Sequence, residues 1–326
     1  MTGNAGGINL HSHLEGSVRP ATAAELASDL GLPAPSGGWG AALEMREAGT
    51  LTTFLAHVAH AYPLFATPDA VRRIVAEAVE DAALDGQRYL ELRFGPATHM
   101  GRGLTLDDVV RAACDGVADA TRGARMDAGL VVCALRHHDA AANAAVATTA
   151  ARFAGHGVVG FDVAGDELLF PDLAPMQEPF AFAAAAGLGL TAHAAEAGPA
   201  SAIREASELL GARRIGHGSR AADDPELLRW AAANGICFEV CPTSNVLTGA
   251  AASYAEHPAR AFVAAGCDVV VGDDDPVTTG SRLANEEHRL VADVGLSGQD
   301  VERMRVVAAD RAFCEPSVRS ALSAGG

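Results

Sequence analysis

Eight short apolar runs, rich in β-branched residues, constrain the fold of this chain more than any other feature of its sequence. They lie at residues 8–10, 89–94, 130–135, 158–163, 190–193, 214–218, 236–241 and 267–271. Such runs are typical of buried strands, and helical patterns separate most of them. Eight strands that alternate with helices predict an α/β fold of the (β/α)8 barrel type, the TIM barrel.

Helix signals lie between these runs. A helix is expected from Thr67-Pro68 to about Asp85, a second after the capping-box-like stretch 105–108, and a third before residue 236. The segment from about residue 20 to 87 is too long for one crossover. It therefore predicts a helical insertion after the first strand, which would lie over the mouth of the barrel.

The chain length is compatible with one large barrel. The sequence has 326 residues, 49% of them hydrophobic, and barrels of this type commonly exceed about 250 residues. We therefore predict a single domain over residues 1–326.

The charge of the chain excludes several functions. The formal net charge is -17, which disfavours binding to nucleic acid or to an acidic membrane surface. An uncharged nucleoside is not excluded. All 24 basic residues are arginine, so Schiff-base lysine chemistry, a P-loop lysine and a lysine that bridges two metal ions are impossible.

Targeting signals are not evident in the sequence. Residues 1–7 lack a basic region followed by an apolar one, and no run of about 18 apolar residues occurs, so we expect neither a signal peptide nor a membrane span. The six cysteines are scattered, which is typical of reduced thiols in a cytoplasmic protein. Cys237 and Cys241 could form a thiolate metal site, but packing in the core explains them better.

Histidine and aspartate residues follow the apolar runs, where the carboxyl ends of parallel strands would meet. The first run leads into His11-Ser12-His13, whose two histidines would share a face of the strand about 6.6 Å apart. His193, His217 and the stretch 273–275 end three other runs. Nitrogen ligands with a carboxylate suit Zn²⁺ with one position left for water, and Fe²⁺ or Mn²⁺ could occupy a similar site. A glutamate three residues after His193 could serve as a general acid or base.

Six motifs resemble those of the adenosine/adenine deaminase family of the amidohydrolase superfamily. They are residues 11–17 (His11-Ser12-His13-Leu14-Glu15-Gly16-Ser17), 162–167, 193–196 (His193-Ala194-Ala195-Glu196), 214–218, 239–245 and 274–276. Their order is that of the family, and they extend over nearly the whole chain. The resemblance implies a metallo-dependent hydrolase barrel that removes the 6-amino group of a purine.

The resemblance also implies residue roles. The ligands of one zinc ion per chain, or of another divalent metal, would be His11, His13, His193 and Asp274. The catalytic residues would be Glu196, His217 and Asp275. The substrate-binding residues would be His13, Glu15, Gly165 and Asp275.

These roles imply a division of the chemistry. Glu196 would be protonated, its pKa raised by an enclosed site, and would give a proton to purine N1. His217 and Asp275 would orient the attacking water and take its proton, and His217 would also stabilise the charge that develops. The Gly165 N–H would meet purine N3. The face formed by residues 51, 54, 55 and 58 could close the pocket or could be part of the core.

Three positions depart from the family pattern. Nucleoside-specific members usually carry aspartate where this chain has Glu15, and glutamate is common among members that act on the free base. Gly272-Asp273 replaces the usual Asn-Thr and would place an additional negative charge near the metal. Ala195 replaces the commoner glycine.

The leading hypothesis is zinc-dependent deamination of adenosine or 2′-deoxyadenosine to inosine or 2′-deoxyinosine plus ammonia. The alternatives are adenine or a 5′-substituted adenosine as substrate, and then another barrel metallohydrolase or a non-catalytic binding protein. A nucleotide is disfavoured because no phosphate site is recognisable. The expected partner is thus a small purine nucleoside or base, and the sequence assigns no oligomeric state.

Overall fold

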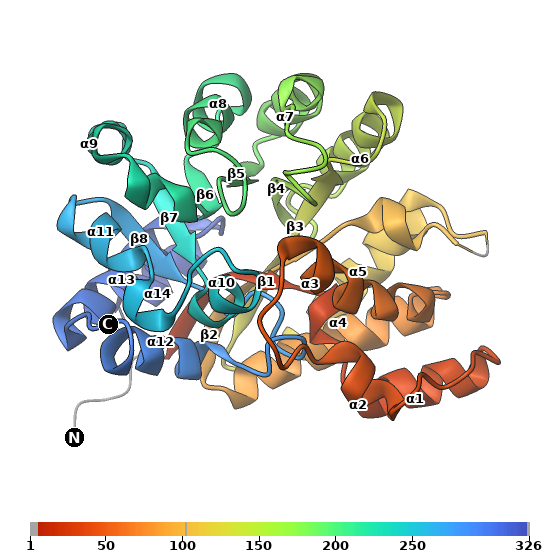
Figure 1. Ribbon diagram of the computed structural model, residues 1–326. Coiled ribbons are helices and arrows are strands. Elements are labelled where there is room, and N and C mark those ends of the chain that lie inside the picture. The colour runs from red at the N-terminus through yellow and green to blue at the C-terminus, as the bar shows by residue number, and fades with distance from the viewer. Residues whose placement is uncertain (1–5, 102, 325–326) are drawn as a thin grey trace.

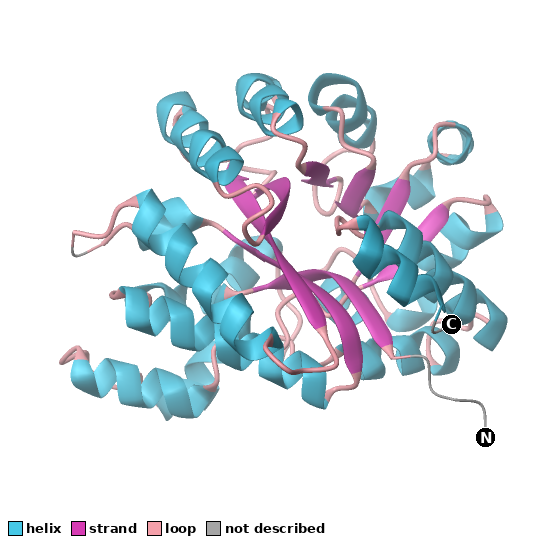
Figure 2. Ribbon diagram, turned by 180° about the vertical axis from the view of Figure 1, so that it is seen from behind, coloured by secondary structure: helices cyan, strands magenta, loops and turns pink. Residues whose placement is uncertain are grey.

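Eight parallel strands form the centre of the protein. The computed structural model describes residues 6–101 and 103–324, so residues 1–5, which belong to the stretch expected to lack a signal peptide, lie outside it. Each strand pairs with the next along the chain, in the order β1 to β8, and a bridge between Ser12 and Asp274 joins the two ends. Helices surround the strands (Figures 1 and 2). The predicted (β/α)8 barrel is confirmed.

The strands are shortest in the second half of the barrel. They are β1 (Gly7–His13), β2 (Gln87–Phe94), β3 (Asp127–Leu135), β4 (Val158–Ala164), β5 (Gly189–Ala194), β6 (Arg214–His217), β7 (Cys237–Val240) and β8 (Asp268–Val271).

The predicted helical insertion lies between β1 and β2. It consists of η1 (Glu15–Ser17), α1 (Pro20–Asp29), α2 (Gly38–Leu43), α3 (Leu51–Val58), η2 (Ala59–Leu64) and α4 (Pro68–Leu84). Helix α4 corresponds to the helix predicted over 67–85, and its first turn is capped by the Thr67 side chain. Helix α3 begins at a capping box made by Thr50 and Thr53.

The remaining helices follow the strands. They are η3 (Pro96–His99), α5 (Leu106–Thr121), α6 (Ala140–Arg152), η4 (Ala174–Met176), α7 (Gln177–Ala185), α8 (Ser201–Leu210), η5 (Ser219–Asp223), α9 (Pro225–Ala233), α10 (Pro242–Leu247), η6 (Tyr254–Glu256), α11 (Ala259–Ala264), α12 (Leu283–Ala292), α13 (Gly298–Arg311) and α14 (Pro316–Ala324). The predicted starts of α5 and α9 are confirmed by a capping box at Thr105 and by the Asp224 cap. Within the described ranges, no helix is both long enough and apolar enough to cross a bilayer.

The main apolar core includes side chains of the strands and of the helices around them, such as Phe161 on β4 and Phe180 on α7. The inside of the barrel is different, because it carries buried charged side chains. Among the largest fully buried side chains are Arg93 on β2 and Arg214 on β6. The functional site is built on these buried charged residues.

Candidate active site

The four residues expected to hold a metal converge at the carboxyl ends of β1, β5 and β8. His11 Nε2 lies 3.1 Å from Asp274 Oδ1, and His13 Nε2 lies 3.4 Å from the same oxygen. The Nε2 atoms of His13 and His193 are 3.2 Å apart. One ligand atom from each of the four residues lies within 4.8 Å of all the others. The structure thus brings together side chains that are up to 263 positions apart in the sequence.

The surroundings of these histidines fit a cation. His11 Nδ1 lies 2.7 Å from Glu239 Oε2, and His193 Nδ1 lies 3.0 Å from Asp162 Oδ2. A carboxylate at Nδ1 keeps the ring hydrogen there and leaves a lone pair on Nε2. Lone pairs and a carboxylate oxygen that face one another at about 3 Å repel unless a positive ion lies between them. Three imidazole nitrogens and one carboxylate are a typical zinc set.

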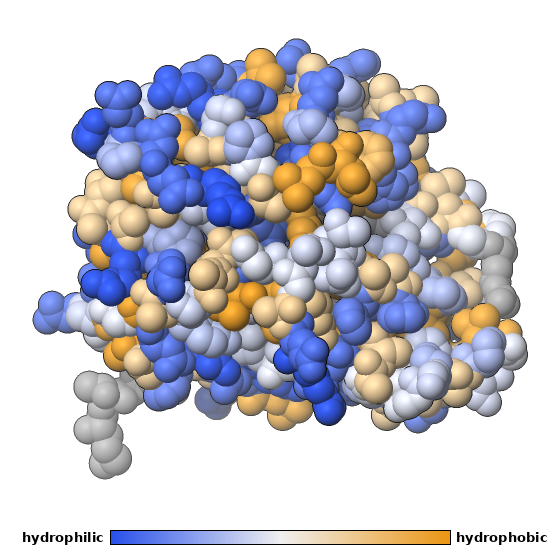
Figure 3. All heavy atoms as spheres, viewed as in Figure 1, coloured by the Kyte–Doolittle hydropathy of each residue, from blue (hydrophilic) through white to orange (hydrophobic). Residues whose placement is uncertain are grey.

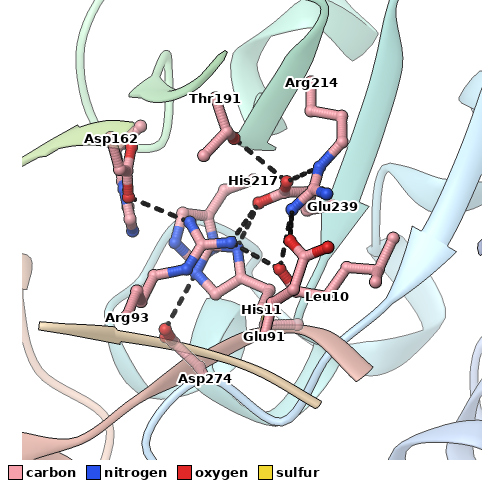
Figure 4. Close-up of polar contacts among 12 residues, drawn as sticks. Leu10, His11, Glu91, Arg93, Asp162, Thr191, Arg214, His217, Glu239 and Asp274 are labelled. Carbon is pink, nitrogen blue, oxygen red and sulfur yellow. Dashed lines mark hydrogen bonds and ion pairs between the residues drawn. The ribbon is translucent and has the colours of Figure 1, made fainter. Parts of the chain in front are cut away.

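A buried ionic network supports the two carboxylates from below (Figure 4). Arg93 donates to Asp162 Oδ2 at 3.0 Å and to Glu239 Oε2 at 2.8 Å, the same two oxygens that face the histidines. Burial opposes ionisation, but the charges of His193 and Arg93 hold the pKa of Asp162 well below its usual range, and Arg93 and Arg214 do the same for Glu239. Both carboxylates therefore remain charged beneath the metal ligands.

Arg214 extends this network to the far side of the barrel interior. It lies 2.7 Å from Glu91 Oε2 and donates to Glu239 Oε1 at 2.6 Å, while Thr191 donates to the same Glu239 oxygen at 3.0 Å. The sequence analysis gave none of these residues a role. The sequence does carry a signal for such residues. Glu91 and Arg93 are charged residues at alternate positions of an apolar run, and alternation directs both side chains into the barrel.

Three residues at the site have strained backbones. Among the described residues, those other than glycine with positive φ are Ala195 at 56°, His217 at 61° and Asp274 at 60°. Left-handed conformations of such residues cost about 1 kcal/mol or more and collect at functional sites. At Ala195 this explains why glycine is the commoner residue of the family, since glycine adopts this φ without strain.

Glu196 lines the same cavity as His13, His193 and Asp274. It is buried, and burial, with the nearby charges of Asp274 and Glu167, raises the pKa of Glu196 well above its ordinary value. Its Oε2 lies 3.7 Å from His217 Nε2. A raised pKa favours the protonated carboxyl group, which can act as a general acid.

The loop that carries Glu196 is held by Glu167, whose role the sequence did not indicate. Glu167 accepts hydrogen bonds from the backbone N–H groups of Ala195 at 2.9 Å, Ala197 at 2.6 Å and Gly198 at 2.8 Å. A Cβ atom at position 198 would lie 2.8 Å from a Glu167 oxygen, so glycine is required there. The backbone on both sides of Glu196 is thus fixed by one buried carboxylate.

Asp275 packs closely against the turn after β1. A Cβ atom at Gly16 would overlap with the Asp275 carboxylate, so this glycine makes room for the acid. Burial, with the charges of Asp274 and Glu15, raises the pKa of Asp275 well above its ordinary value. Its Oδ1 is buried and has no hydrogen-bond partner among the described residues. A raised pKa makes the ionised form of this carboxylate a stronger proton acceptor.

The cavity above the metal ligands has a volume of about 300 Å³. Gly165 lies on its wall with φ of 112°, a conformation in which any side chain would be strained. All of the candidate residues except His11 line the cavity. His11 lies beneath it, fully buried.

The mouth of the cavity is apolar. The side chains that line it there are Leu51, Phe54, Leu55 and Val58 on α3, with Leu169 and Phe170 on the β4–α7 loop. The face of α3 therefore contributes to the pocket, and Phe54 and Val58 also pack against Met45. Thr52 on α3 donates to Asp166 Oδ2 at 2.6 Å and joins the two sides of the mouth. Figure 3 shows hydrophobic side chains over the β4–α7 region.

Glu15 also lines the cavity, but its carboxylate has protein partners. Its Oε1 accepts from the Gly95 N–H at 3.0 Å and lies 2.9 Å from His99 Nε2. The His99 ring stacks on Phe65 with centroids 4.1 Å apart. The sequence analysis did not identify His99, because its partner is 84 positions away in the chain.

Asp273, expected to place an additional negative charge near the metal, contributes to the raised pKa of Asp275 although its side chain lies outside the main cavity. Its side chain lines a separate cavity of about 40 Å³ with Ser12, Asp85 and Gln87, outside the cavity that contains the metal ligands. Asp274, which has a positive φ, and Asp275 both line the main cavity instead. Burial raises the pKa of Asp273 to about 6.

The cysteine pair is divided between the two ends of β7. Cys237 packs at the start of the strand with Ile8 and Leu10. Cys241 follows the strand and lies near His11, His217 and Asp274. The two thiols therefore do not form a shared metal site.

Comparison with known proteins places the chain in a family. The family model Adenosine deaminase matches residues 7–325. An adenosine deaminase from Mycolicibacterium vanbaalenii is 38% identical over 335 residues, which cover 96% of this chain and 91% of the relative.

Solved structures show the same barrel. An adenine deaminase from Arthrobacter aurescens superimposes with a TM-score of 0.90 at 25% identity, covering 98% of this chain and 97% of the other. A cog1816 amidohydrolase from Burkholderia ambifaria with bound Zn gives 0.88 at 26% identity, with 98% and 88% covered. The apo N6-methyl-AMP deaminase from Arabidopsis thaliana gives 0.84 at 25% identity, with 97% and 94% covered. The chain belongs to the adenosine deaminase family and is a hydrolytic deaminase of the amidohydrolase type.

Proposed function

We propose that one barrel domain spanning this chain catalyses the zinc-dependent hydrolytic deamination of a 6-aminopurine nucleoside. The products would be inosine or 2′-deoxyinosine and ammonia. The observation that carries the proposal is the presence of two groups in one cavity. The Nε2 atoms of His11, His13 and His193 converge with Asp274, and Glu196, whose carboxyl group has a raised pKa, lines the same cavity.

The ion would be held by the three histidines and Asp274. When bound, it would act as a Lewis acid and lower the pKa of water toward neutrality. The nitrogen-rich ligand set and the bound Zn of the Burkholderia ambifaria amidohydrolase favour zinc over other divalent metals.

The chain's own residues would then move the protons. Glu196 would donate its proton to purine N1, which makes C6 electrophilic, and Asp275 would accept the proton of the attacking water. The Gly165 N–H would donate to purine N3. Burial of Glu196 and Asp275 strengthens these interactions because little bulk water screens them.

An uncharged substrate fits the cavity better than a nucleotide. Five carboxylates line it, those of Glu15, Asp166, Glu196, Asp274 and Asp275, and no described lining residue is arginine. A phosphate group would therefore meet repulsion and no bidentate partner there.

Two alternative substrates have support from the structure. Adenine is favoured by the similarity to the adenine deaminase and by Glu15, whose carboxylate is already engaged by Gly95 and His99. A 5′-substituted adenosine is favoured by the apolar mouth, where Leu169 and Phe170 are exposed. Replacing Glu15 by aspartate tests the first alternative, since it should change the ratio of kcat/KM for adenosine to that for adenine.

The decisive experiment is a spectrophotometric screen with an ammonia assay. The zinc-loaded protein is offered adenosine, 2′-deoxyadenosine, adenine, AMP and 5′-substituted adenosines, and the same protein after chelator treatment serves as control. We expect the highest kcat/KM with an uncharged nucleoside and loss of activity after metal removal. Absence of ammonia release from every compound would contradict the proposal.

A further inference from the structure

We propose that Asn245 and His257 are positioning residues that fix the tautomer of His217, so that His217 presents an Nε2 hydrogen to the cavity. For its catalytic consequence this inference rests on the proposed function. The arrangement itself is a chain of three buried side chains that begins at two backbone N–H groups and ends at His217. Asn245 is fully buried, and His217 and His257 are each 2% exposed.

The orientation of the Asn245 amide is set by a backbone donor. Asn245 lies on α10, and its Oδ1 accepts from the Cys241 backbone N–H at 3.4 Å. A backbone N–H can only donate, so this side of the amide must be the oxygen. The amide nitrogen then faces His217, with Nδ2 2.9 Å from His217 Nδ1.

The orientation of His257 gives the same result independently. The Ala259 backbone N–H donates to His257 Nδ1 at 3.2 Å, so this nitrogen carries a lone pair. A neutral imidazole then has its hydrogen on Nε2. His257 Nε2 lies 3.0 Å from Asn245 Oδ1, where that hydrogen meets an acceptor. Two separate backbone groups therefore specify one direction of donation.

The consequence for His217 follows from the same rule. Asn245 Nδ2 is a donor, so His217 Nδ1 must be the acceptor and the ring hydrogen must lie on Nε2. A hydrogen on Nδ1 would point at the amide N–H of Asn245. Because the contact is buried, no water can replace the lost hydrogen bond.

The tautomer separates the roles of His217 and Asp275. An Nε2–H group can donate to the oxygen that adds to C6 and stabilise its developing charge, but it cannot accept a proton. Asp275, which lines the same cavity, is then the acceptor. As the water oxygen bonds to C6, its proton goes to Asp275, the C6–N1 π electrons move to N1, and Glu196 supplies the proton there. The family resemblance alone implied proton acceptance by both residues.

The first test reads the tautomer directly and does not depend on activity. Long-range 1H–15N NMR spectra of the zinc-loaded protein with 15N-labelled histidine distinguish the two neutral tautomers, and His217→Gln assigns the signal. We expect His217 to carry its hydrogen on Nε2. A His217 ring with its hydrogen on Nδ1 would overturn the inference even if the enzyme proved inactive, whereas inactivity with the expected tautomer would count against the proposed function alone.

The second test reverses the direction of the hydrogen bond between residue 245 and His217, with almost no change in the shape of the side chain. Asn245→Asp replaces the donor amide by an acceptor, so the hydrogen of His217 should move to Nδ1. Loss of one donor to a developing oxyanion costs about 10²–10³-fold in kcat, and we expect a loss of this size with KM and zinc content close to wild type. Asn234→Asp, at an exposed position, is the matched control and should leave kcat unchanged. Wild-type kcat in Asn245→Asp would overturn the inference.

Variants of His257 separate positioning from packing. His257→Gln keeps a side-chain donor for Asn245 Oδ1, whereas His257→Leu fills similar space without one. We expect the glutamine variant to retain most of the wild-type kcat and the tautomer of His217, and the leucine variant to lose about tenfold, since the Cys241 N–H still holds the amide. Equal losses in the two variants would show that His257 acts only through packing.

Discussion

The floor and the mouth of the cavity are built in opposite ways. The floor, beneath the metal ligands, consists of charged side chains such as Arg93, Asp162 and Glu239. They have no exposed surface, and hydrogen bonds of 2.8 and 3.0 Å join them. The mouth consists mostly of apolar side chains, and Leu169 and Phe170 there are 64% and 42% exposed.

This difference matches two different tasks. Charge-assisted hydrogen bonds are directional, and in a buried setting they hold histidine rings in one tautomer and one orientation. Apolar contacts have no such directionality, so a mouth made of them can admit related substrates without disturbing the reacting atoms. We therefore expect changes in the floor to affect every substrate equally, and changes in the mouth to affect the choice among substrates.

The largest effect is expected at Glu196, which lies between the two regions. Glu196→Gln keeps the size of the side chain but cannot donate a carboxyl proton, and general acid catalysis contributes about 10²–10⁴-fold. We expect kcat to fall by that factor with zinc retained, whereas His193→Ala should lose the metal itself. Elemental analysis and steady-state kinetics measure both, and equal zinc content and equal activity in the two variants would defeat the assignment.

A somewhat smaller effect is expected at Glu167. Glu167→Gln replaces one of the two oxygens that hold the backbone of residues 195–198, so Glu196 should be displaced from its place. A misplacement of about 1 Å can cost roughly 10²-fold in rate. We expect this loss in kcat with unchanged zinc content, and hydrogen exchange of the 195–198 amides should become faster. The exposed Glu178→Gln is the control, and unchanged exchange in Glu167→Gln would refute its anchoring role.

The floor is tested through metal affinity. Asp162→Asn removes the charge that faces His193 Nδ1 and leaves the side-chain size unchanged. Loss of such an outer partner typically lowers metal affinity by about 10–100-fold. Titration against a competing chelator measures the change, with exposed Asp172→Asn as control. Wild-type zinc affinity in Asp162→Asn would mean that the floor does not prepare the ligands.

The smallest effect is expected at Ala195. Ala195→Gly relieves a left-handed alanine, worth about 1–2 kcal/mol, but loses a buried methyl group of about 0.8 kcal/mol and adds backbone entropy to the unfolded chain. The free energy of unfolding should therefore change by less than about 1 kcal/mol, with kcat unchanged. Chemical denaturation and kinetics check both, and a large loss of either would show that the methyl group has a role at the site.

The predictable features were those with local signals. The apolar runs and the helix-capping residues predicted the barrel and its insertion. The histidines at the ends of the runs predicted the residues that converge, because parallel topology brings the carboxyl ends of the strands together. The ionic floor was not predicted. Which of several charged residues pair inside a barrel depends on strand order and register, and Arg93 contacts Glu239 across 146 positions. The Glu15–His99 and Asn245–His257 contacts were missed for the same reason, and the direction of the Asp273 side chain depends on the backbone after β8.

The division between floor and mouth is tested most directly by the ratio of kcat/KM for adenosine to kcat/KM for adenine. This ratio is measured at saturating zinc in wild type, Asp162→Asn and Leu169→Ser. We predict that Asp162→Asn lowers both values by one common factor and leaves the ratio unchanged, whereas Leu169→Ser changes the ratio severalfold with kcat nearly intact. A changed ratio in Asp162→Asn with an unchanged one in Leu169→Ser would contradict the account.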